Sequence, residues 1–417
     1  MNQKTLIGLA AAALVAILVA VVLNHAHAPR SEGGREETRY LAPELRDHVN
    51  DVDKVVVTGA DNKTIATISR GQSGWTIAEK GGFAADTGKL REFLLKLSDA
   101  TLLEQKTSSK EKYATLGVDD VSNKEAKGLQ VELGGLKQPV KLIVGNTSPR
   151  GGTFVRRAGE PESWLASGNI NVEKKAEDWL RKDLADIAAN RVQSVAITHA
   201  DGKSVTVAKA SEADANFKIA DVPKGREAGS EFAANGLGST LAGLRFDDVL
   251  AAKDAPVGDK ALKAHYAMFD GLVVDVTAWE KDGKDYARFA ASLDSSQADA
   301  HIAAQQAKEK ADYDTAVAAS KKDDKSADAA KQADADAEPV KPAAVADPAK
   351  DREDKRAALQ KEVADLNVRF NDWTYVLPAY KYANLNKSLD DLLKPLDDKK
   401  AEPAKKPAAK APVKKAG

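Results

Sequence analysis

The chain of 417 residues contains no cysteine, which excludes disulfide bonds, thiolate chemistry and cysteine-ligated zinc. It also carries little net charge of either sign: the formal net charge is −1, although 30% of the residues are charged. Such a balance gives no support to a nucleic-acid partner and provides no overall electrostatic field. Charge therefore has to be examined segment by segment.

Signatures of catalysis are also lacking. The glycine-rich residues 145–152 (GNTSPRGG) do not end in the Gly-Lys-Ser/Thr that cradles phosphate, and they lie between two predicted strands, so we interpret them as a hairpin loop. No Gly-x-Ser-x-Gly elbow selects a nucleophilic serine. The six histidines, which show no spacing typical of metal ligands, are His25, His27, His48, His199, His265 and His301. We therefore predict no catalytic, metal-binding or cofactor-binding residue, no cofactor and no enzymatic activity.

One long hydrophobic run is present near the N-terminus. Residues 5–23 (TLIGLAAAALVAILVAVVL) form a run of about 19 uncharged residues, enough to cross about 30 Å of hydrocarbon as a helix. The alternative is a cleavable signal peptide, because residues 26–28 (AHA) imitate a cleavage site, but the length of the run and Pro29 favour an uncleaved anchor. Lysine and arginine counts do not fix the orientation. We expect a cytoplasmic N-terminus and an exported bulk, the usual layout of a signal anchor.

One pattern of residues occurs twice in the remainder of the chain. Residues 52–65 align without a gap with residues 192–205. The identities in this alignment are Val52, Val55, Thr58, Ala60, Asp61 and Lys63, which recur as Val192, Val195, Thr198, Ala200, Asp201 and Lys203. A duplication of this kind predicts two copies of one structural unit.

The first copy reads as strands, a helix and more strands. Alternation between Val55 and Ile77 predicts a meander of about three strands. A helix is expected next, with its apolar face formed by Leu90, Phe93, Leu94 and Leu97. Further strands are expected over 129–133, 140–145 and 153–156, followed by a closing helix over 171–180.

The second copy follows the same order with substitutions. Phe217 and Ile219 take the places of Trp75 and Ile77. The leucines expected to match Leu94, Leu97 and Leu103 are Leu241, Leu244 and Leu250. Strands are expected over 272–277 and 286–290, and a closing helix over 384–393 is paired with the one over 171–180.

Recurring aspartates and the tryptophans are the remaining candidates for a site. Asp61 and Asp201 could form paired carboxylates, but each precedes Asn or Gly and then Lys in a predicted β-turn, where aspartate is favoured for local hydrogen bonds. Exposed tryptophans can stack on sugars or anchor a partner. The tryptophans are Trp75, Trp164, Trp179, Trp279 and Trp373. Trp75 is expected in the core, because phenylalanine replaces it in the second copy.

Composition sets the boundaries of the predicted segments. From about residue 292 to 366 the second copy is interrupted by Ala, Lys and Asp with few large apolar residues, which favours a solvated helical arm broken by prolines rather than a core. We expect helix up to about residue 337 and again from 351 to 366. The predicted segments are an anchor (1–28), a stalk (29–50), a first repeat (51–188), a second repeat (189–396) with its charged insert (292–366), and a disordered tail (397–417).

Several short motifs together resemble one bacterial family. They are residues 52–57 (VDKVVV), 74–77 (GWTI), 113–119 (YATLGVD), 142–145 (LIVG) and 153–156 (TFVR), with a Leu-x-x-Leu helix between the second and third. The pattern resembles the domain of unknown function 4340 (DUF4340) family, with its most specific match at 113–119. In the second copy, residues 265–271 (HYAMFDG) are expected to occupy the place of that motif. The resemblance covers 52–184 well and 191–396 more weakly.

The resemblance implies a membrane anchor followed by repeats, and an association with ABC-type export systems related to gliding-motility auxiliary components. None of its motifs implies a catalytic residue. We expect an α+β fold consisting of an N-terminal transmembrane helix and two tandem repeats of a twisted, mainly antiparallel sheet with packed helices.

The leading functional hypothesis is a non-enzymatic, membrane-anchored accessory or scaffold subunit of an envelope ABC-type transport complex. It would be a single-pass protein of the cytoplasmic membrane with its bulk extracytoplasmic or periplasmic. The expected partners are the lipid bilayer, through residues 5–23, and proteins of the complex, but no nucleic acid. The alternatives are a cell-wall or polysaccharide-binding protein and an exported hydrolase. A groove with exposed aromatic residues would favour the former, and a pocket with convergent polar groups the latter.

Overall fold

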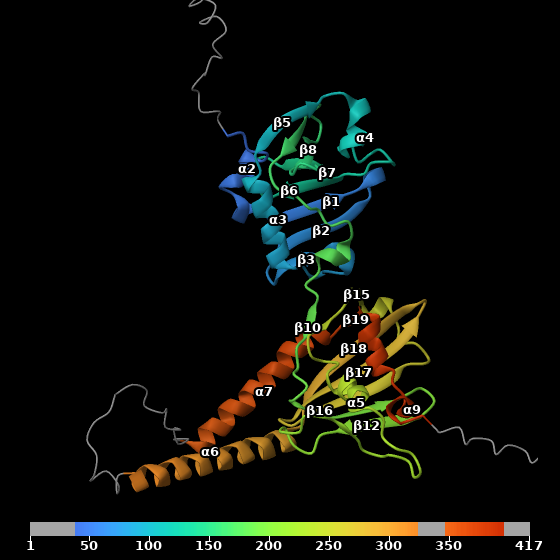
Figure 1. The fold of residues 1–417 in the computed structure, drawn as a ribbon. Helices are drawn as coiled ribbons and strands as arrows, with labels where there is room; N and C mark the ends of the chain where they lie inside the picture. The colour runs from blue at the N-terminus through green and yellow to red at the C-terminus, as the bar shows by residue number, and fades with distance from the viewer. Residues whose placement is uncertain (1–37, 324–346, 396–417) are drawn as a thin grey trace, which may run out of the picture.

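The computed structural model describes residues 38–323 and 347–395, which form two β-sheet domains stacked end to end (Figure 1). The first domain holds a nine-stranded sheet in the order β4-β3-β2-β1-β6-β7-β8-β9-β5. Its strands are β1 (Lys54–Thr58), β2 (Thr64–Gly71), β3 (Gly74–Ile77), β4 (Phe83–Ala84), β5 (Leu102–Thr107), β6 (Leu129–Gly134), β7 (Val140–Thr147), β8 (Thr153–Arg157) and β9 (Ser163–Ala166). Every neighbouring pair in this sheet is antiparallel.

The helices of the first domain lie around this sheet. They are α2 (Pro43–Arg46), α3 (Thr87–Asp99) and α4 (Tyr113–Leu116), with the 3-10 turns η1 (Val49–Asp51), η2 (Ala60–Asn62), η3 (Ala78–Lys80), η4 (Lys110–Lys112) and η5 (Ala176–Trp179). Helix α3 begins after Asp86, whose side chain accepts a hydrogen bond from the Lys89 amide and so caps the helix. Its apolar face is buried as the leucine spacing predicts, at Leu90, Phe93, Leu94 and Leu97.

The second domain holds an eight-stranded antiparallel sheet in the order β13-β12-β11-β16-β17-β18-β19-β15. Its strands are β11 (Val192–Thr198), β12 (Ser204–Ala208), β13 (Lys218–Ile219), β15 (Asp248–Ala251), β16 (Leu262–Met268), β17 (Leu272–Lys281), β18 (Lys284–Leu293) and β19 (Trp373–Val376). The remaining elements are α5 (Glu231–Gly238), η6 (Ala252–Asp254), α6 (Ser295–Asp323), α7 (Pro348–Phe370), α8 (Ala379–Leu385), α9 (Leu389–Leu392) and the two-stranded sheet of β10 (Asp183–Ala185) and β14 (Leu244–Arg245). Apart from the additional β4, the two large sheets have the same strand order.

Strand register shows which residues are equivalent in the two sheets. Ile68 pairs with Ile77 in the first domain, and Val207 pairs with Ile219 in the second. Trp75 and Phe217, each two residues earlier, therefore occupy equivalent positions on the same face of the strand. Their environments differ: Phe217 is 2% exposed, whereas Trp75 is only partly buried.

An aromatic contact joins the two domains. Phe83 of β4 is 7% exposed, and its ring centroid lies 4.9 Å from that of Trp373 and 5.4 Å from that of Phe246. Beside this contact, Lys80 Nζ lies 2.6 Å from Asp248 Oδ1. The first domain thus inserts a side chain into the apolar core of the second.

The expected fold class, an α+β protein led by a transmembrane helix, is wrong for the part of the chain that the structure describes. That part is a mostly antiparallel β-sheet protein with helices, and none of its helices is long and apolar enough to cross a membrane. The predicted anchor at residues 5–23, and with it the whole segment 1–28, lies outside the described residues, as does the predicted tail over 397–417.

The predicted stalk over 29–50 is wrong where the structure describes it. Leu41 and Leu45 are 2% and 0% exposed and belong to the main core, so this segment packs into the first domain instead of spacing it. Residues 29–37 lie outside the described residues.

Three predicted equivalences are also wrong. Residues 171–180 contain only the 3-10 turn η5, whereas 384–393 include the end of α8 and the helix α9. Residues 265–271 do not resemble the turn at 113–119 in structure, because 265–268 lie within β16, a strand paired with β11 on one side and β17 on the other. Leu241 and Leu244, expected on a helix, follow the end of α5.

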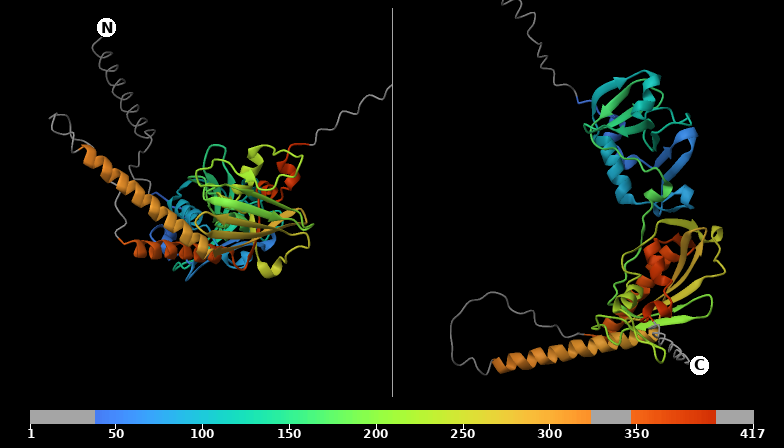
Figure 2. Two further views of the ribbon diagram at one scale, coloured as in Figure 1. Left: turned by 90° about the horizontal axis from the view of Figure 1, so that it is seen from below. Right: turned by 45° about the vertical axis from the view of Figure 1, so that its right-hand side comes forward.

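The charged insert forms two helices, α6 and α7, between β18 and β19, and α6 projects from the second domain (Figures 1 and 2). The expectation that the insert builds no core is wrong at its base. Ala298 and Ile302 of α6 are 0% and 1% exposed, and Leu366 and Phe370 of α7 are 3% and 1% exposed. The bases of both helices therefore belong to the folded domain, although residues 324–346 lie outside the described residues.

Candidate functional site

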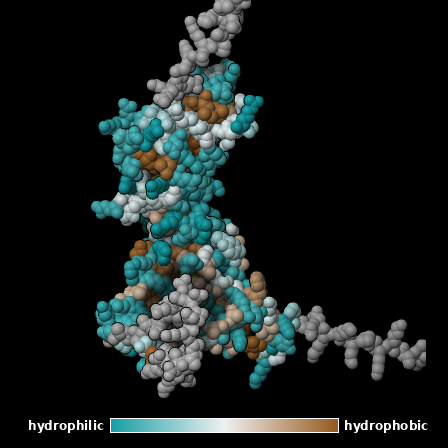
Figure 3. All heavy atoms as spheres, turned by 60° about the vertical axis from the view of Figure 1, so that its left-hand side comes forward, coloured by the Kyte–Doolittle hydropathy of each residue, from teal (hydrophilic) through white to brown (hydrophobic). Residues whose placement is uncertain are grey.

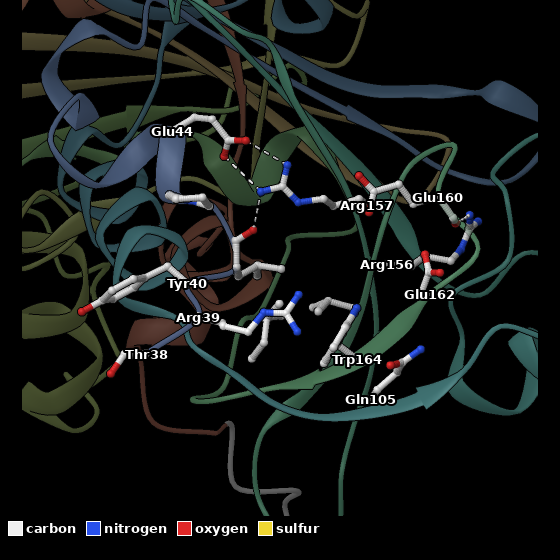
Figure 4. A pocket seen from close by; sticks show the side chains of 14 residues that line it. Thr38, Arg39, Tyr40, Glu44, Gln105, Arg156, Arg157, Glu160, Glu162 and Trp164 are labelled. Atoms are coloured by element: carbon white, nitrogen blue, oxygen red, sulfur yellow. Dashed lines mark hydrogen bonds and ion pairs between the residues drawn. The ribbon is translucent and has the colours of Figure 1, made fainter. Parts of the chain in front are cut away.

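A cleft of about 670 Å³ opens in the first domain, between residues 38–44 and the strands β5, β8 and β9 (Figure 4). It is lined mainly by polar and charged side chains, which include Arg39, Glu44, Arg157 and Glu160. A cleft with several convergent polar groups is the natural first candidate for a site in a protein without a bound ligand.

The backbone on one side of the cleft is fixed by pairing with the start of β5. The Leu102 amide donates to the Arg39 carbonyl at 2.7 Å, and the Leu41 amide donates to the Ala100 carbonyl at 2.8 Å. Tyr40 forms an antiparallel bridge with Thr101 between these bonds. The segment that the sequence assigned to a stalk is therefore an edge of the first sheet, and it supplies part of the cleft wall.

The central charged pair of the cleft joins Arg157 to Glu44. Arg157 Nη1 and Nη2 donate to the two carboxylate oxygens of Glu44 at 2.9 and 3.0 Å, and Nη2 also donates to the Leu41 carbonyl at 2.8 Å. These hydrogen bonds lower the pKa of Glu44 and raise the pKa of Arg157. Glu44 is therefore ionised and held in place at neutral pH, which suits a structural carboxylate rather than a general base.

The aromatic rings of the cleft each carry an arginine on one face. The Arg39 guanidinium lies 4.8 Å from the ring centroid of Trp164, and that of Arg46 lies 4.0 Å from the ring centroid of Tyr40. Such cation–π contacts stabilise both groups, and here they occupy a ring face that a sugar would need for stacking. Arg39 is exposed and has no carboxylate within ion-pair distance among the described residues. The cleft is suited to binding a polar surface, and its geometry shows no pair of groups arranged for proton transfer.

The motif at 113–119 has a structural role. Helix α4 ends at Gly117, which has a left-handed φ of 70°, and Tyr113 packs with Val118 in a small separate core. Arg156, 2% exposed, lies 4.6 Å above the Tyr113 ring and donates to the Val118 carbonyl at 2.9 Å. A Cβ at Gly145 would lie 2.4 Å from the Leu116 carbonyl oxygen, so the glycine allows β7 to pass close to this turn. The motif therefore specifies packing rather than chemistry.

The histidines lie apart from one another. Nδ1 of His48 contacts Asp51 at 2.7 Å, Nδ1 of His265 contacts Asp275 at 2.7 Å, and Nδ1 of His301 contacts Glu212 at 3.4 Å. In the described ranges 38–323 and 347–395, no group of three or more potential ligands could hold a metal ion. His25 and His27 lie outside these ranges.

The recurring aspartates remain in their turns and on different sheets. Asp201 accepts the Lys203 amide at 3.0 Å, which is the local hydrogen bond that the turn interpretation predicts. Asp61 adopts a left-handed φ of 58°. The two do not form a paired carboxylate site.

The tryptophans divide into core and cleft residues. Trp179 and Trp279 are each 1% exposed, Trp75 and Trp373 are partly buried against the main core, and Trp164 lines the cleft. The sequence did not predict that Arg39, Glu44 and Arg157 line a cleft. Arg39 and Glu44 lie in the presumed stalk, and no local pattern relates them to Arg157 on a strand more than a hundred positions away.

The model of the DUF4340 family, described as a domain of unknown function, matches residues 75–264. The match supports the resemblance to this family, and it runs from β3 of the first sheet into β16 of the second. It thus includes the motif at 113–119 and excludes the charged insert and Glu44. No curated protein and no solved structure matches the chain.

Proposed function

We propose that the protein is a non-enzymatic accessory or scaffold subunit of an envelope ABC-type transport complex, with the described domains outside the cytoplasmic membrane. The observation that carries the proposal is the helical arm, α6 and α7, which is rooted in the second domain and extends beyond it (Figure 2). The association with transport systems comes from the family resemblance, and the structure contributes the shape on which a scaffold role depends.

The root of the arm is held by an ion-pair cluster. Arg191 Nη1 and Nη2 donate to both carboxylate oxygens of Glu362 on α7 at 2.7 Å each, and Arg191 Nε donates to Asp270 Oδ2 at 2.5 Å. Burial alone would lower the pKa of Arg191, but its hydrogen bonds with Glu362 and Asp270 raise it. A bidentate guanidinium–carboxylate pair fixes direction as well as distance, so α7 leaves the domain at a defined angle.

The N-terminal turns of α7 brace the first half of α6. Gln306 Nε2 donates to the Pro348 carbonyl and to Asp351 Oδ2, both at 2.8 Å, and Lys355 Nζ lies 3.4 Å from Glu309. Beyond Ile302, none of the residues of α6 from Ala303 to Ala318 is buried. A rooted helix whose outer surface covers nothing in its own domain is suited to contacting another protein.

One face of the described part of the molecule is mainly polar (Figure 3). On the face shown in Figure 3, hydrophilic residues predominate, and hydrophobic residues form small separate patches on both domains. A partner bound to this face would meet charged and polar groups, which is typical of assemblies whose members also exist apart.

Shortening the arm tests this proposal. We would replace residues 311–346 with a short Gly-Ser linker, because the Gln306–Pro348 contact already brings the two ends together. Stability should change by less than about 0.5 kcal/mol, as for other exposed surface changes. Proteins that co-purify with the full chain from gently solubilised cell envelopes should be lost. The control variant carries a Gly-Ser linker in place of residues 148–152, the β7–β8 turn, and should retain them.

If the shortened chain retains every co-purifying protein, the arm has no scaffold role and the proposal fails. Location is tested separately by fusing alkaline phosphatase after Leu396, which should be active if this end of the chain lies outside the cytoplasm. Activity of a cytoplasmic reporter fused at the same position would contradict the proposed location.

A further inference from the structure

A second, smaller pocket in the first domain is lined by lysines. It has a volume of about 490 Å³ and lies between the turn at η2, the start of β6 and the residues before η5. Its lysines are Lys63, Lys127, Lys174 and Lys175, all of them exposed. Among the described residues none of the four has a carboxylate within ion-pair distance, so their positive charge is not neutralised by the protein.

The carboxylates nearest in sequence are already engaged by other lysines. Glu173 lies 3.2 Å from Lys89, and Asp178 lies 3.6 Å from Lys182. Glu177, the acidic residue lining the pocket, lies 3.4 Å from Lys80. Burial raises the pKa of Glu177, but its backbone hydrogen bond, Lys80 and Lys175 together lower it below its ordinary value. The nearby carboxylates thus form their ion pairs with lysines outside the pocket, and Glu177 interacts with Lys175 only beyond ion-pair distance.

The pocket is built on a fixed turn and has an apolar floor. The Gly59 amide donates to the Lys63 carbonyl at 2.8 Å, and the Asn62 amide donates to the Val121 carbonyl at 2.9 Å, which ties the turn to the neighbouring loop. Ile65 and Leu129 line the floor; Leu129 is 8% exposed. The arrangement therefore combines cationic walls with a small hydrophobic surface.

The second repeat carries lysines that correspond to two of these. Val57 pairs with Val131, and Ile197 pairs with Ala264, so Lys127 corresponds to Lys260. Lys203 of the second repeat aligns with Lys63.

The surroundings of the lysines in the second repeat differ locally from those in the first. Lys203 is paired with Asp201 at 3.2 Å, and His199, which replaces Gly59, places its Nε2 atom 3.1 Å from the Lys387 carbonyl oxygen. The glycine leaves that space open in the first repeat.

We propose that the lysine pocket of the first repeat binds an acidic peptide segment of a partner protein, one that alternates carboxylate and apolar side chains. Carboxylates would neutralise the lysines, and an apolar side chain would cover Ile65 and Leu129. The apolar floor favours a peptide over an inorganic anion, which would leave that floor exposed. The inference rests on the proposed scaffold function, because it supplies the chemistry of one partner contact.

The test uses the full chain and a short synthetic peptide that alternates glutamate with leucine, titrated by calorimetry at low salt. Saturable binding is expected, and it should weaken as salt rises. The triple variant Lys63→Gln/Lys127→Gln/Lys174→Gln should bind at least about tenfold more weakly, because three lysine–carboxylate contacts are lost. The matched triple variant Lys203→Gln/Lys260→Gln/Lys387→Gln should bind within about twofold of the wild type, since it changes charge equally but away from the pocket.

A second variant, Gly59→His, closes the pocket without removing charge. Gly59 has a φ of −105°, which any residue adopts, and an added Cβ would meet the flexible Ile65 Cδ1 at 3.0 Å. Binding should fall as in the first triple variant. Absence of saturable binding by the wild type, equal weakening in both triple variants, or inorganic phosphate competing as well as the peptide would each overturn the proposal. The arm-shortened protein should bind the peptide normally, so a failed arm test and a failed peptide test lead to separate conclusions.

Discussion

The two repeats have the same strand order, apart from the additional β4, but differ in some of the connections between strands. Residues 158–162 connect β8 to β9 in the first sheet, whereas the equivalent connection from β18 to β19 contains the whole arm. The turn after β1 has Gly59, which lines a pocket, whereas the turn after β11 has His199, whose Nε2 atom lies 3.1 Å from the Lys387 carbonyl oxygen. Alternating apolar residues therefore maintain the sheet in both copies, while the loops, which lie outside the ladders, acquire separate roles.

The largest expected change in stability is at the equivalent positions Phe217 and Trp75. Phe217→Ala should cost about 3 to 5 kcal/mol, because the ring is 2% exposed and fills the space beside Gly238. Trp75→Ala should cost less, about 1 to 2 kcal/mol, because that side chain is only partly buried. Urea unfolding of the two variants measures the difference. Equal losses would show that the two positions are energetically as well as topologically equivalent.

A smaller effect is expected at the root of the arm. Arg191→Met should destabilise the second domain by about 2 kcal/mol, because it leaves the partly buried Glu362 and Asp270 without their partner. Arg245→Met provides the control, since the pair of Arg245 and Asp183 is mostly exposed and its loss should cost about 0.5 kcal/mol or less. Thermal denaturation compares the two. If Arg245→Met is as destabilised as Arg191→Met, the ion pairs at the root of the arm contribute no more to stability than an exposed ion pair.

The smallest effect is the pH dependence of the cleft in the first repeat. The pKa of Glu44 is lower in the folded protein than its ordinary value of 4.5, so its stabilising contribution is present above that value and is lost as pH falls through the folded pKa. Glu44→Gln should reduce stability at neutral pH by about 1 kcal/mol or less. The difference from the wild type should vanish in acid. A difference that persists unchanged at low pH would mean that packing, and not the ion pair with Arg157, accounts for the loss.

Local pattern predicted most elements of the first sheet. Strands over 129–133, 140–145 and 153–156 form as expected, because alternation and turn residues agree there. The prediction at 265–271 was wrong because it rested on the expected repeat of the motif at 113–119. The alternation of Leu262, Ala264 and Tyr266, all buried in β16, indicates a strand there instead. Period-two burial was the better physical signal at that place.

Elements whose identity depends on distant partners could not be predicted. Leu41 and Leu45 form too short an apolar pair to distinguish a packed turn from a stalk, and only their contact with the core decides the matter. The cleft depends on the Glu44–Arg157 pair, which brings together residues far apart in sequence. The recurrence of Lys63 is visible in the sequence, but the pocket that it lines is not. The pocket also depends on Gly59, which has no side chain to fill it.

The position of the arm between β18 and β19 also affects the order of folding. Strand β15 forms its ladder with β19, so this edge of the second sheet remains incomplete until the ribosome has synthesised residue 376. Closing that loop costs about 2.5 kcal/mol more in chain entropy than closing the short β8–β9 connection, if both are treated as flexible. The first sheet can assemble while the chain is still emerging, whereas the second must hold apolar strands unpaired for longer. Because Phe83 packs against Trp373, the joint between the domains forms last, and chaperones that protect nascent chains have most to protect in the second repeat.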